Sequence, residues 1–513
     1  MMEANNAVNN KRIAKNTLIL YLRMFLTVGV SLYTSRVVLA NLGISDYGLY
    51  NVIGGFVSMF YMITASLTQA ISRFITFELG KNDMKKLEDT FSTSVFILFI
   101  LSLVVVLLAE TIGLWFINYK LNIDADRMVA ANWVYQFTVL AFVLEMLSIP
   151  YSALIVSHEK MGTFAFVTIM KVILMLVVAL LLSVSPLDTL IFYGILTFVV
   201  SLGVQGMYYV YCRRNFRESS VHIHFDKDLF NEMFGFAGWN FLSTVASMLS
   251  SQGVNMMLNI FFGTPVNAAR GIAGQINGTA GAFSKNFTMA LSPQITKSYA
   301  SGDKLYSKTL VCQGAKYSFL LLLIVALPVM LETDYVLSLW LKEVPPYASA
   351  FVQLQLAYAL VDVLVYTNLI LNNATGKIKA YQLLISITQF AIIPVSYIVL
   401  KLGGNPVLTI AMTNLMYALI VIPRINLNRQ FVGITFGYFF KTVIVKLFIV
   451  CFLTTTVCLL IQARLEVSFG RLILITFVSI FCIAVLTYFI ALSVSERKVI
   501  MGIVKSRMLK NRM

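Results

Sequence analysis

Residues 91–117 read FSTSVFILFILSLVVVLLAETIGLWFI and contain a single charged side chain, Glu110. An α-helix rises about 1.5 Å per residue, so a segment of this length crosses the roughly 30 Å hydrocarbon core of a bilayer. Its apolar residues are continuous, whereas the strands of a membrane β-barrel alternate apolar and polar residues. The segment therefore predicts a transmembrane helix.

Comparable apolar segments fill most of the chain. Of its 513 residues, 59% are hydrophobic and 12% are charged, whereas soluble domains have about 45–50% apolar and about 25% charged residues. Because lipid cannot hydrogen-bond to backbone polar groups, these segments must be helical. We predict an all-α polytopic membrane protein with about fourteen transmembrane helices. Their expected ranges are 16–38, 50–77, 91–117, 130–157, 162–184, 188–211, 230–262, 268–299, 309–331, 347–372, 378–400, 406–423, 436–462 and 472–492.

The basic residues indicate how the chain is oriented. It contains 39 Lys and Arg against 23 Asp and Glu, a net charge of +16. These cations lie mostly in short polar gaps between apolar segments, which argues against nucleic-acid binding and fits the excess of Lys and Arg in cytoplasmic loops. A cytoplasmic N-terminus places most of them in the cytoplasm. We therefore predict that both termini are cytoplasmic.

No sequence motif points to catalysis. The five cysteines form no CxxC pair and lie mostly in or beside apolar segments, so neither a disulfide nor a metal site is predicted. The chain contains no Walker motif, GxSxG elbow or HExxH motif. We expect no cofactor, no metal and no enzymatic activity. Any energy source would then be an ion gradient or the consumption of a product, not ATP hydrolysis by this chain.

Weak internal matches predict two lobes. Leu67 and Ile71 in the second expected helix are matched by Leu291 and Ile295 in the eighth, and a similar match relates the fourth helix to the tenth. Matches between helices six apart favour two parallel six-helix repeats related by an axis along the membrane normal. The expected parts are an N-terminal lobe (1–211), a cytoplasmic linker (212–229), a C-terminal lobe (230–424), and two further helices with a basic cytoplasmic tail (425–513).

Polar residues recur at helical spacing in the first two helices of each expected lobe. A helix surrounded by lipid would be apolar on all sides, so such stripes mark a wet or protein-facing surface. We expect the four helices to line one shared cavity. The predicted cavity-lining polar residues are Gln69, Asn240, Ser247, Asn255, Gln275 and Asn286.

Charged residues within the expected helices are candidate functional residues, because each costs about 2.5–3.5 kcal/mol at the centre of a membrane helix. Glu145 and Lys171 lie at similar depth, as do Asp362 and Lys316, so we expect two ion pairs that are either structural or proton-coupling. Other cations have no obvious acidic neighbour in sequence. They would form a cationic site for an anion such as a diphosphate, for which Arg is geometrically suited. These are Arg23, Arg36, Arg73, Arg270 and Lys285.

Two short segments resemble a known family. Residues 36–50 read RVVLANLGISDYGLY and are followed by Ile71-Ser72-Arg73, while residues 267–273 read NAARGIA. This pattern resembles the O-antigen and capsule repeat-unit flippases. They form the polysaccharide transporter branch of the superfamily that also contains multidrug exporters and the lipid II flippase.

The resemblance implies a function. It implies flipping of an undecaprenyl-diphosphate-linked oligosaccharide across the bacterial inner membrane by alternating access, with the lipid tail in a lateral opening between the first and eighth helices. Members of the family keep cationic residues in the cavity, matched here by the five cations named above. It also implies a lipid-linked glycan and the bilayer as partners, H+ or Na+ as a coupling ion, and contacts with glycan polymerase and assembly proteins.

Three alternatives remain open. A lipid II flippase is the closest. A multidrug or cation antiporter would need acidic residues in the polar stripes, which contain none. A membrane polysaccharide polymerase or ligase would be an enzyme with a large external loop, whereas the longest outer loop expected here is 332–346.

Overall fold

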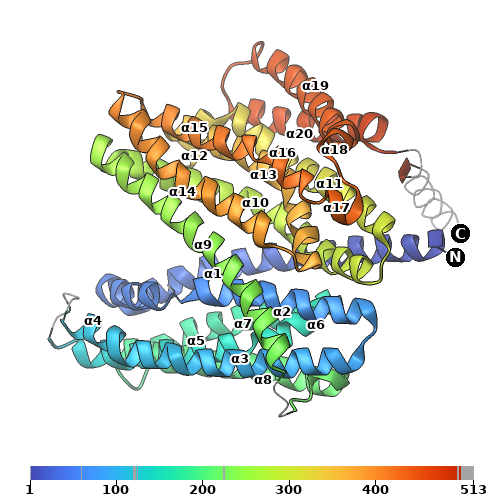
Figure 1. The fold of residues 1–513 in the computed structure, drawn as a ribbon. Coiled ribbons are helices and arrows are strands. Elements are labelled where there is room, and N and C mark those ends of the chain that lie inside the picture. Colours follow the sequence, from blue (N-terminus) through green and yellow to red (C-terminus); the bar gives the residue numbers. More distant parts are fainter. Residues whose placement is uncertain are drawn as a thin grey trace, which may run out of the picture. The chain divides into compact units, whose positions relative to one another are not determined.

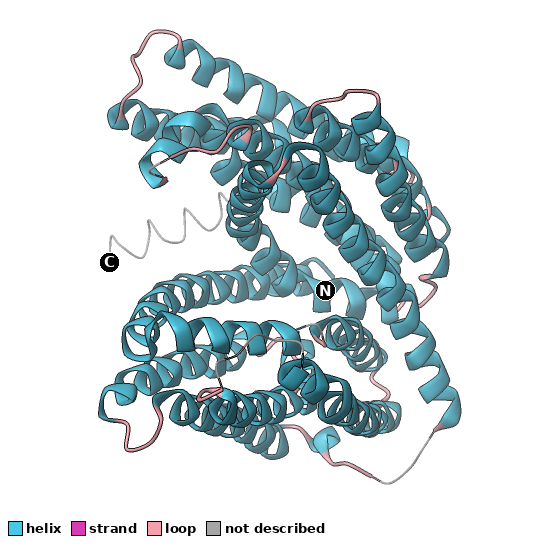
Figure 2. Cartoon of the chain, turned by 90° about the vertical axis from the view of Figure 1, so that its left-hand side faces the viewer, coloured by secondary structure: helices cyan, strands magenta, loops and turns pink. Residues whose placement is uncertain are grey.

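The computed structural model describes residues 2–58, 60–119, 123, 125–222, 226–341, 343–493 and 496–497. Within these residues all regular structure is helical (Figure 2), which confirms the predicted all-α class. The α-helices (Figure 1) are α1 (Met2–Ser58), α2 (Tyr61–Lys81), α3 (Met84–Leu108), α4 (Leu114–Tyr119), α5 (Met128–Leu147), α6 (Ile149–Ser157), α7 (Met161–Leu181), α8 (Thr189–Asn215), α9 (Lys227–Phe262), α10 (Thr264–Ala300), α11 (Lys304–Leu331), α12 (Thr333–Trp340), α13 (Ala348–Thr375), α14 (Lys379–Lys401), α15 (Pro406–Leu419), α16 (Val421–Asn426), α17 (Arg429–Val432), α18 (Phe436–Phe439), α19 (Val445–Gln462) and α20 (Phe469–Leu486).

Eleven helices in the described residues are long and apolar enough to cross a membrane, and a bent pair, Ser45–Val57 with Tyr61–Lys81, raises the number to twelve. Two further expected spans coincide with α9 and α10, whose Asn, Gln, Ser and Gly residues lower their hydropathy. The predicted number of fourteen is therefore not confirmed. The helical ranges themselves agree closely with the prediction.

Glycine separates the first two spans. Helix α1 is broken at Gly43, which has φ 77° and ψ 169°. Only glycine adopts this backbone conformation without strain. The first span therefore ends at Gly43 and the next begins at Ser45, before a bend of 50° into α2.

The chain divides into two compact units. Unit 1 contains Met1–Val245 and Ala290–Asp303, and unit 2 contains Ala246–Met289 and Lys304–Met513. Helices α9 and α10 each pass from one unit to the other along their length. The predicted lobes with ends at residues 211 and 424 stay a prediction.

In unit 1, a tyrosine holds α5 against the irregular end of α3. A short π-helical turn, Ala109–Gly113, joins α3 to α4. The buried Tyr135 on α5 donates a hydrogen bond to the Ala109 carbonyl at 2.7 Å. A Cβ at Gly113 would lie 1.9 Å from the Tyr135 hydroxyl oxygen, so only glycine fits there.

One arginine joins three helices of unit 1 at one end. Arg127, just before α5, pairs with Asp46 on α1 and with Asp188 just before α8. Asp188 also caps α8 by accepting from the amides of Leu190 at 3.1 Å and Ile191 at 3.2 Å. Burial alone would raise the pKa of Asp188, but the hydrogen bonds from Arg127 and these amides lower it overall.

In unit 2, buried amide side chains fix α13. Asn428, in the turn after α16, donates to the Asn368 carbonyl at 3.0 Å, and Asn372 donates to the Asn428 side chain at 3.5 Å. Thr367 donates to the Val311 carbonyl on α11 at 3.0 Å. Because a buried amide without a partner would cost free energy, these bonds specify how α13 packs against its neighbours.

Candidate functional site

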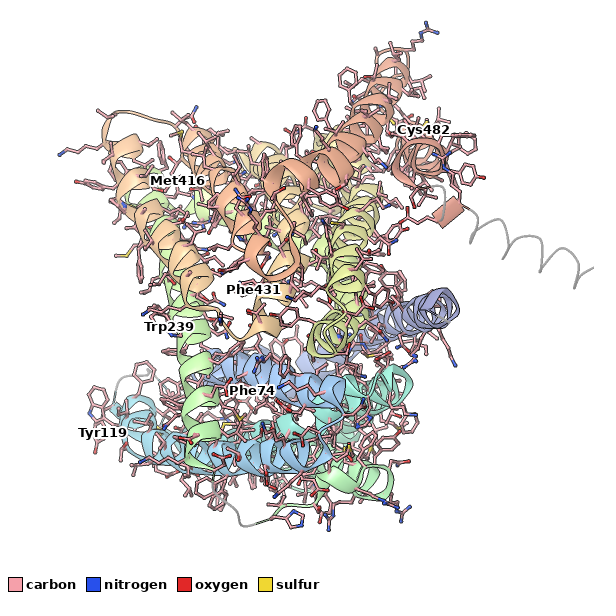
Figure 3. The ribbon with its side chains drawn as sticks, turned by 45° about the vertical axis from the view of Figure 1, so that its right-hand side comes forward. Phe74, Tyr119, Trp239, Met416, Phe431 and Cys482 are labelled. Atoms are coloured by element: carbon pink, nitrogen blue, oxygen red, sulfur yellow. The ribbon has the colours of Figure 1, made fainter. Side chains whose placement is uncertain are left out.

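The predicted cations of unit 1 differ in their surroundings. Arg23 on α1 is half-buried, with its guanidinium 5.1 Å from the centre of the Phe164 ring on α7, whereas Arg36 is exposed. Arg73 on α2 is buried. Its guanidinium lies 4.3 Å from the Phe74 ring centre (Phe74 is labelled in Figure 3) and 3.7 Å from Glu232 on α9.

The predicted cations of unit 2 both lie on α10. Arg270 is half-buried, and its Nη1 is shielded from solvent without a hydrogen-bond partner in the described part of the chain. Lys285 is exposed and makes no ion pair with any described residue. The two residues are about four helical turns apart, so they project from a similar side of α10.

Three other basic residues within the helices of unit 2 are paired with carboxylates. Lys316 pairs with Glu496 at 2.8 Å, Arg424 with Asp362 at 3.5 Å, and Arg471 with Glu332 at 2.6 Å. Membrane helices generally pair such charges because an isolated charge is costly there. Among the described residues of unit 2, Arg270 and Lys285 form no ion pair with a carboxylate, and neither do Lys441 and Lys446 in the span Phe436–Gln462. What distinguishes Arg270 and Lys285 is that they share one helix, α10, whose residues in unit 2 include no Asp or Glu.

The structure brings Glu145 and Lys171 together in an ion pair, and Tyr61 on α2 donates to the same carboxylate at 2.5 Å. Both members are partly exposed, with 30% of the Glu145 side chain and 38% of the Lys171 side chain accessible. This cluster joins α2, α5 and α7 within unit 1.

The prediction that Lys316 pairs with Asp362 is wrong. Lys316 bonds instead to Glu496 and to the Ala491 carbonyl, and Asp362 lies next to Arg424. The expectation compared only the depths of the two residues, and depth does not say which helices are neighbours. Glu496, which follows α20, and Arg424 on α16 are partners that sequence analysis missed.

Replacing Lys171 with Met should destabilise the protein, because Glu145 then keeps its charge without its ammonium partner. Replacing Glu145 with Gln as well should recover part of the loss. We expect a coupling of about 0.6 kcal/mol and at most about 1.7 kcal/mol, as double-mutant cycles give for polar pairs between membrane helices. Thermal unfolding of the two single variants and the double variant in detergent measures it. Additive effects would show that the pair contributes no coupling.

The predicted cavity-lining polar residues divide into two groups. Gln69, Ser247 and Gln275 are exposed, as a cavity lining requires. Of the others, two donate to the backbone of their own helix: Asn240 to the Phe236 carbonyl at 3.0 Å and Asn286 to the Ala282 carbonyl at 2.8 Å. Asn255 on α9 accepts from Asn267 on α10 at 2.7 Å.

Sequence analysis also missed two buried carboxylates at the ends of α6 and α8. Glu159 is surrounded by donors from α1 and α10. Glu218 accepts from His158 at 2.5 Å, and the imidazole stacks on Phe216 at 4.2 Å. Burial alone would raise the pKa of Glu218, but the His158 hydrogen bond lowers it overall. Both carboxylates lie in loops between expected helices, where no sequence pattern marked them.

Comparisons with known proteins establish the family and the fold. A family model described as polysaccharide biosynthesis protein matches residues 13–300. No curated protein matches the chain. A solved structure of a MATE transporter in the bent conformation is similar with a TM-score of 0.72 at 12% identity, covering 82% of this chain and 95% of that chain.

Two further solved structures agree. A multidrug resistance MATE family transporter of the MOP superfamily, in an outward-facing conformation, has a TM-score of 0.69 at 13% identity, covering 80% of this chain and 94% of that chain. A MOP superfamily transporter from Pyrococcus furiosus, whose binding pocket has reverse polarity suggesting a different function, has a TM-score of 0.71 at 12% identity, covering 82% of this chain and 95% of that chain. At these identities the likeness shows the MATE fold.

The family match confirms the resemblance carried by residues 36–50 and 267–273, both of which lie inside it. It spans more than half of the 513 residues. With its apolar helices and MATE fold, this chain is a multi-pass membrane protein that belongs to the polysaccharide biosynthesis protein family.

Proposed function

We propose that the chain flips an undecaprenyl-diphosphate-linked oligosaccharide repeat unit across the bacterial inner membrane by alternating access. The observation that carries this proposal is the pair of uncompensated cations on α10, Arg270 and Lys285. A cation kept on a membrane helix without a carboxylate is a candidate ligand for an anion. The diphosphate of a lipid-linked glycan supplies that anion.

Each of the two cations is chemically suited to a diphosphate, although about 22 Å of helix separates them, so one diphosphate would contact them in turn. The guanidinium of Arg270 presents a planar fork of donors, which matches two phosphate oxygens, while the ammonium of Lys285 acts as a mobile point charge. Their projection from a similar side of α10 supports a shared path for an anion along the helix. The exposed amide of Gln275 between them would offer hydrogen bonds to sugar hydroxyls.

The sign of the charge disfavours an exporter of organic cations. Residues 246–289 of unit 2, which include most of α10, contain no Asp or Glu. The Pyrococcus furiosus transporter of the same fold, with its binding pocket of reverse polarity, is a precedent for a change of polarity on this scaffold. A lipid II flippase shares the diphosphate chemistry and remains the second candidate.

The proposal also covers the orientation, the coupling ion and the partners of the protein. Both termini would lie in the cytoplasm, H+ or Na+ would drive the cycle, and a glycan polymerase with its assembly proteins would take the product. The oligosaccharide would be used for O-antigen or another surface polysaccharide. The excess of Lys and Arg in the expected cytoplasmic loops supports this orientation.

Deleting the gene tests the proposal. We expect surface polysaccharide to be lost and a lipid-diphosphate-linked oligosaccharide to accumulate in the membrane, because the repeat unit is made on the inner leaflet and cannot cross. Mass spectrometry of extracted lipids identifies the glycan. Accumulation of lipid II instead would favour the second candidate. Unchanged lipids with normal surface polysaccharide would contradict both.

A further inference from the structure

Glu159, in the turn between α6 and α7, combines two unfavourable features. Its φ of +60° lies in the left-handed region, which costs a non-glycine residue about 1–2 kcal/mol. Its side chain is only 2% exposed, although it carries a carboxylate. A glycine would remove the backbone strain, so the presence of glutamate points to a role for the side chain.

Four donors surround this residue within unit 1. Its carboxylate accepts from Gln294 Nε2 at 2.6 Å, Lys297 Nζ at 2.9 Å and Arg12 Nη1 at 3.3 Å. Its backbone carbonyl accepts from Asn16 Nδ2 at 3.3 Å. Glu159 therefore joins the start of α1 to the end of α10, and charge-assisted bonds of this kind are the stronger ones in proteins.

The end of α10 is the segment that passes from unit 2 into unit 1. Helix α10 belongs to unit 2 up to Met289 and to unit 1 from Ala290. Pro293 follows this point by three residues and, lacking an amide hydrogen, weakens the helix there. The segment after the proline carries both Gln294 and Lys297, so α10 has a potential hinge directly before its attachment to Glu159.

A second contact secures the same segment. A Cβ on Gly80, near the end of α2, would lie 2.8 Å from the Cα of Lys297 and 2.8 Å from the Cβ of Ala300. No side chain fits at that distance, so glycine is what allows α2 to approach α10 so closely. Any larger residue at position 80 would force these two helix ends apart.

The cations of this cluster are more accessible than the carboxylate that holds them. Arg12 is 46% exposed and Lys297 is 25% exposed, against 2% for Glu159. An anion arriving from solvent would therefore meet the outer sides of the two cations first.

We infer that Glu159 is a latch that keeps the end of α10 attached to unit 1, and that a diphosphate-bearing lipid releases it by competing for Arg12 and Lys297. The identity of the anion rests on the proposed function, whereas the latch itself rests on the contacts above. Loading of the cargo would then free α10 to move about Pro293. Without cargo, Glu159 keeps the segment in place.

Cysteine labelling tests the latch. Ser298 lies on the attached segment and is 7% exposed, so a Ser298→Cys reporter should react slowly with a maleimide. The reporter is introduced into the full chain, with its five native cysteines replaced, in lipid nanodiscs. We expect Glu159→Gln to accelerate labelling about tenfold, because the neutral amide no longer holds the two cations. Unchanged labelling would overturn the latch.

Two further variants serve as controls. Glu218→Gln removes a neighbouring buried carboxylate that bonds to His158 and not to α10, and it should leave labelling slow. Gly80→Val should accelerate labelling without altering any charge, because it separates α2 from α10. Acceleration by Glu218→Gln equal to that by Glu159→Gln would overturn the specific role of Glu159. Should Glu159→Gln fail to fold, unchanged labelling in Gly80→Val would overturn the latch.

A second experiment tests whether a ligand releases the latch, and it compares two sources of diphosphate. Farnesyl diphosphate added to the nanodiscs should accelerate labelling of the otherwise unmodified reporter protein several-fold, and inorganic diphosphate at the same concentration should act less strongly. Acceleration by neither probe, or by inorganic diphosphate alone, would overturn release by a lipid diphosphate. Fast labelling in Glu159→Gln does not depend on the cargo, so failure of the proposed function would leave that result unchanged.

Discussion

Under the proposed function, cells carrying Lys285→Ala in place of the native protein will lose most of their surface polysaccharide while keeping normal amounts of the protein in the membrane. Lys285 makes no ion pair with any described residue, so its removal leaves no carboxylate unpaired. A hydrogen bond to a charged group contributes about 1.5–3 kcal/mol. Losing one from the bound diphosphate should therefore reduce transport about 10- to 100-fold.

Two further variants on α10 accompany this prediction, one that keeps the charge and one that removes the other cation. Lys285→Arg keeps a cation at the position and should retain most of the transport. Arg270→Ala should resemble Lys285→Ala in its effect on transport. Immunoblotting of membranes and quantification of surface glycan separate loss of transport from loss of protein. Normal surface glycan in both alanine variants would remove the basis for the cationic site.

A contrasting variant shows why pairing matters. Lys316 is buried, and its ammonium bonds to Glu496 and to the Ala491 carbonyl. Replacing this lysine would leave Glu496 without its ammonium, so its variants should lower stability as well as activity. Charged residues on membrane helices thus fall into two classes, and only the unpaired class is a good guide to cargo binding.

The helices could be predicted from sequence because their information is local. Continuous apolar segments fix where a helix crosses the membrane, and the break at Gly43 falls within the gap between the first two predicted ranges. Helices α9 and α10 were also predicted, because segments of about 20 mostly apolar residues mark them even though their polar residues lower the hydropathy. Local pattern is therefore sufficient for the fold class and for the approximate helical ranges, but not for every boundary: the expected loop 332–346 contains helix α12.

The pairing of charges could be predicted only in part, because it depends on which helices are neighbours. Glu145 and Lys171 lie on successive spans, and the structure brings them together. Lys316 and Glu496 are separated by 180 residues, and Glu496 lies beyond the last predicted helix. Similarly, nothing in the sequence near Glu159 indicates donors on α1 and α10.

The predicted cations also differ in whether a residue from another helix lies next to them. Sequence analysis grouped Arg73 with Lys285 because neither has an acidic residue nearby in the chain. In the structure Arg73 lies among aromatic rings and near Glu232, a residue on another helix. Of the two, Lys285 is the better candidate for contact with cargo.

The largest expected effect on stability is at a buried ion pair in unit 2. Glu332, between α11 and α12, accepts from Arg471 Nη2 at 2.6 Å, and their side chains are only 1% and 9% exposed. Arg471 also donates to the Leu465 carbonyl at 2.9 Å. The pair therefore fixes the turn after α11 against the hairpin of α19 and α20.

Removing one partner of this pair leaves the other charge buried and uncompensated. We expect Glu332→Ala or Arg471→Met to reduce the free energy of unfolding by about 3–5 kcal/mol. The double variant Glu332→Gln with Arg471→Met should lose much less, because no charge then remains buried. Thermal unfolding in detergent, followed by tryptophan fluorescence, measures all three variants. The partly exposed Glu145–Lys171 pair provides the comparison, since solvent near a charge reduces the penalty for leaving it alone. If single variants at both pairs lowered stability equally, burial would not be what makes the Glu332–Arg471 pair important.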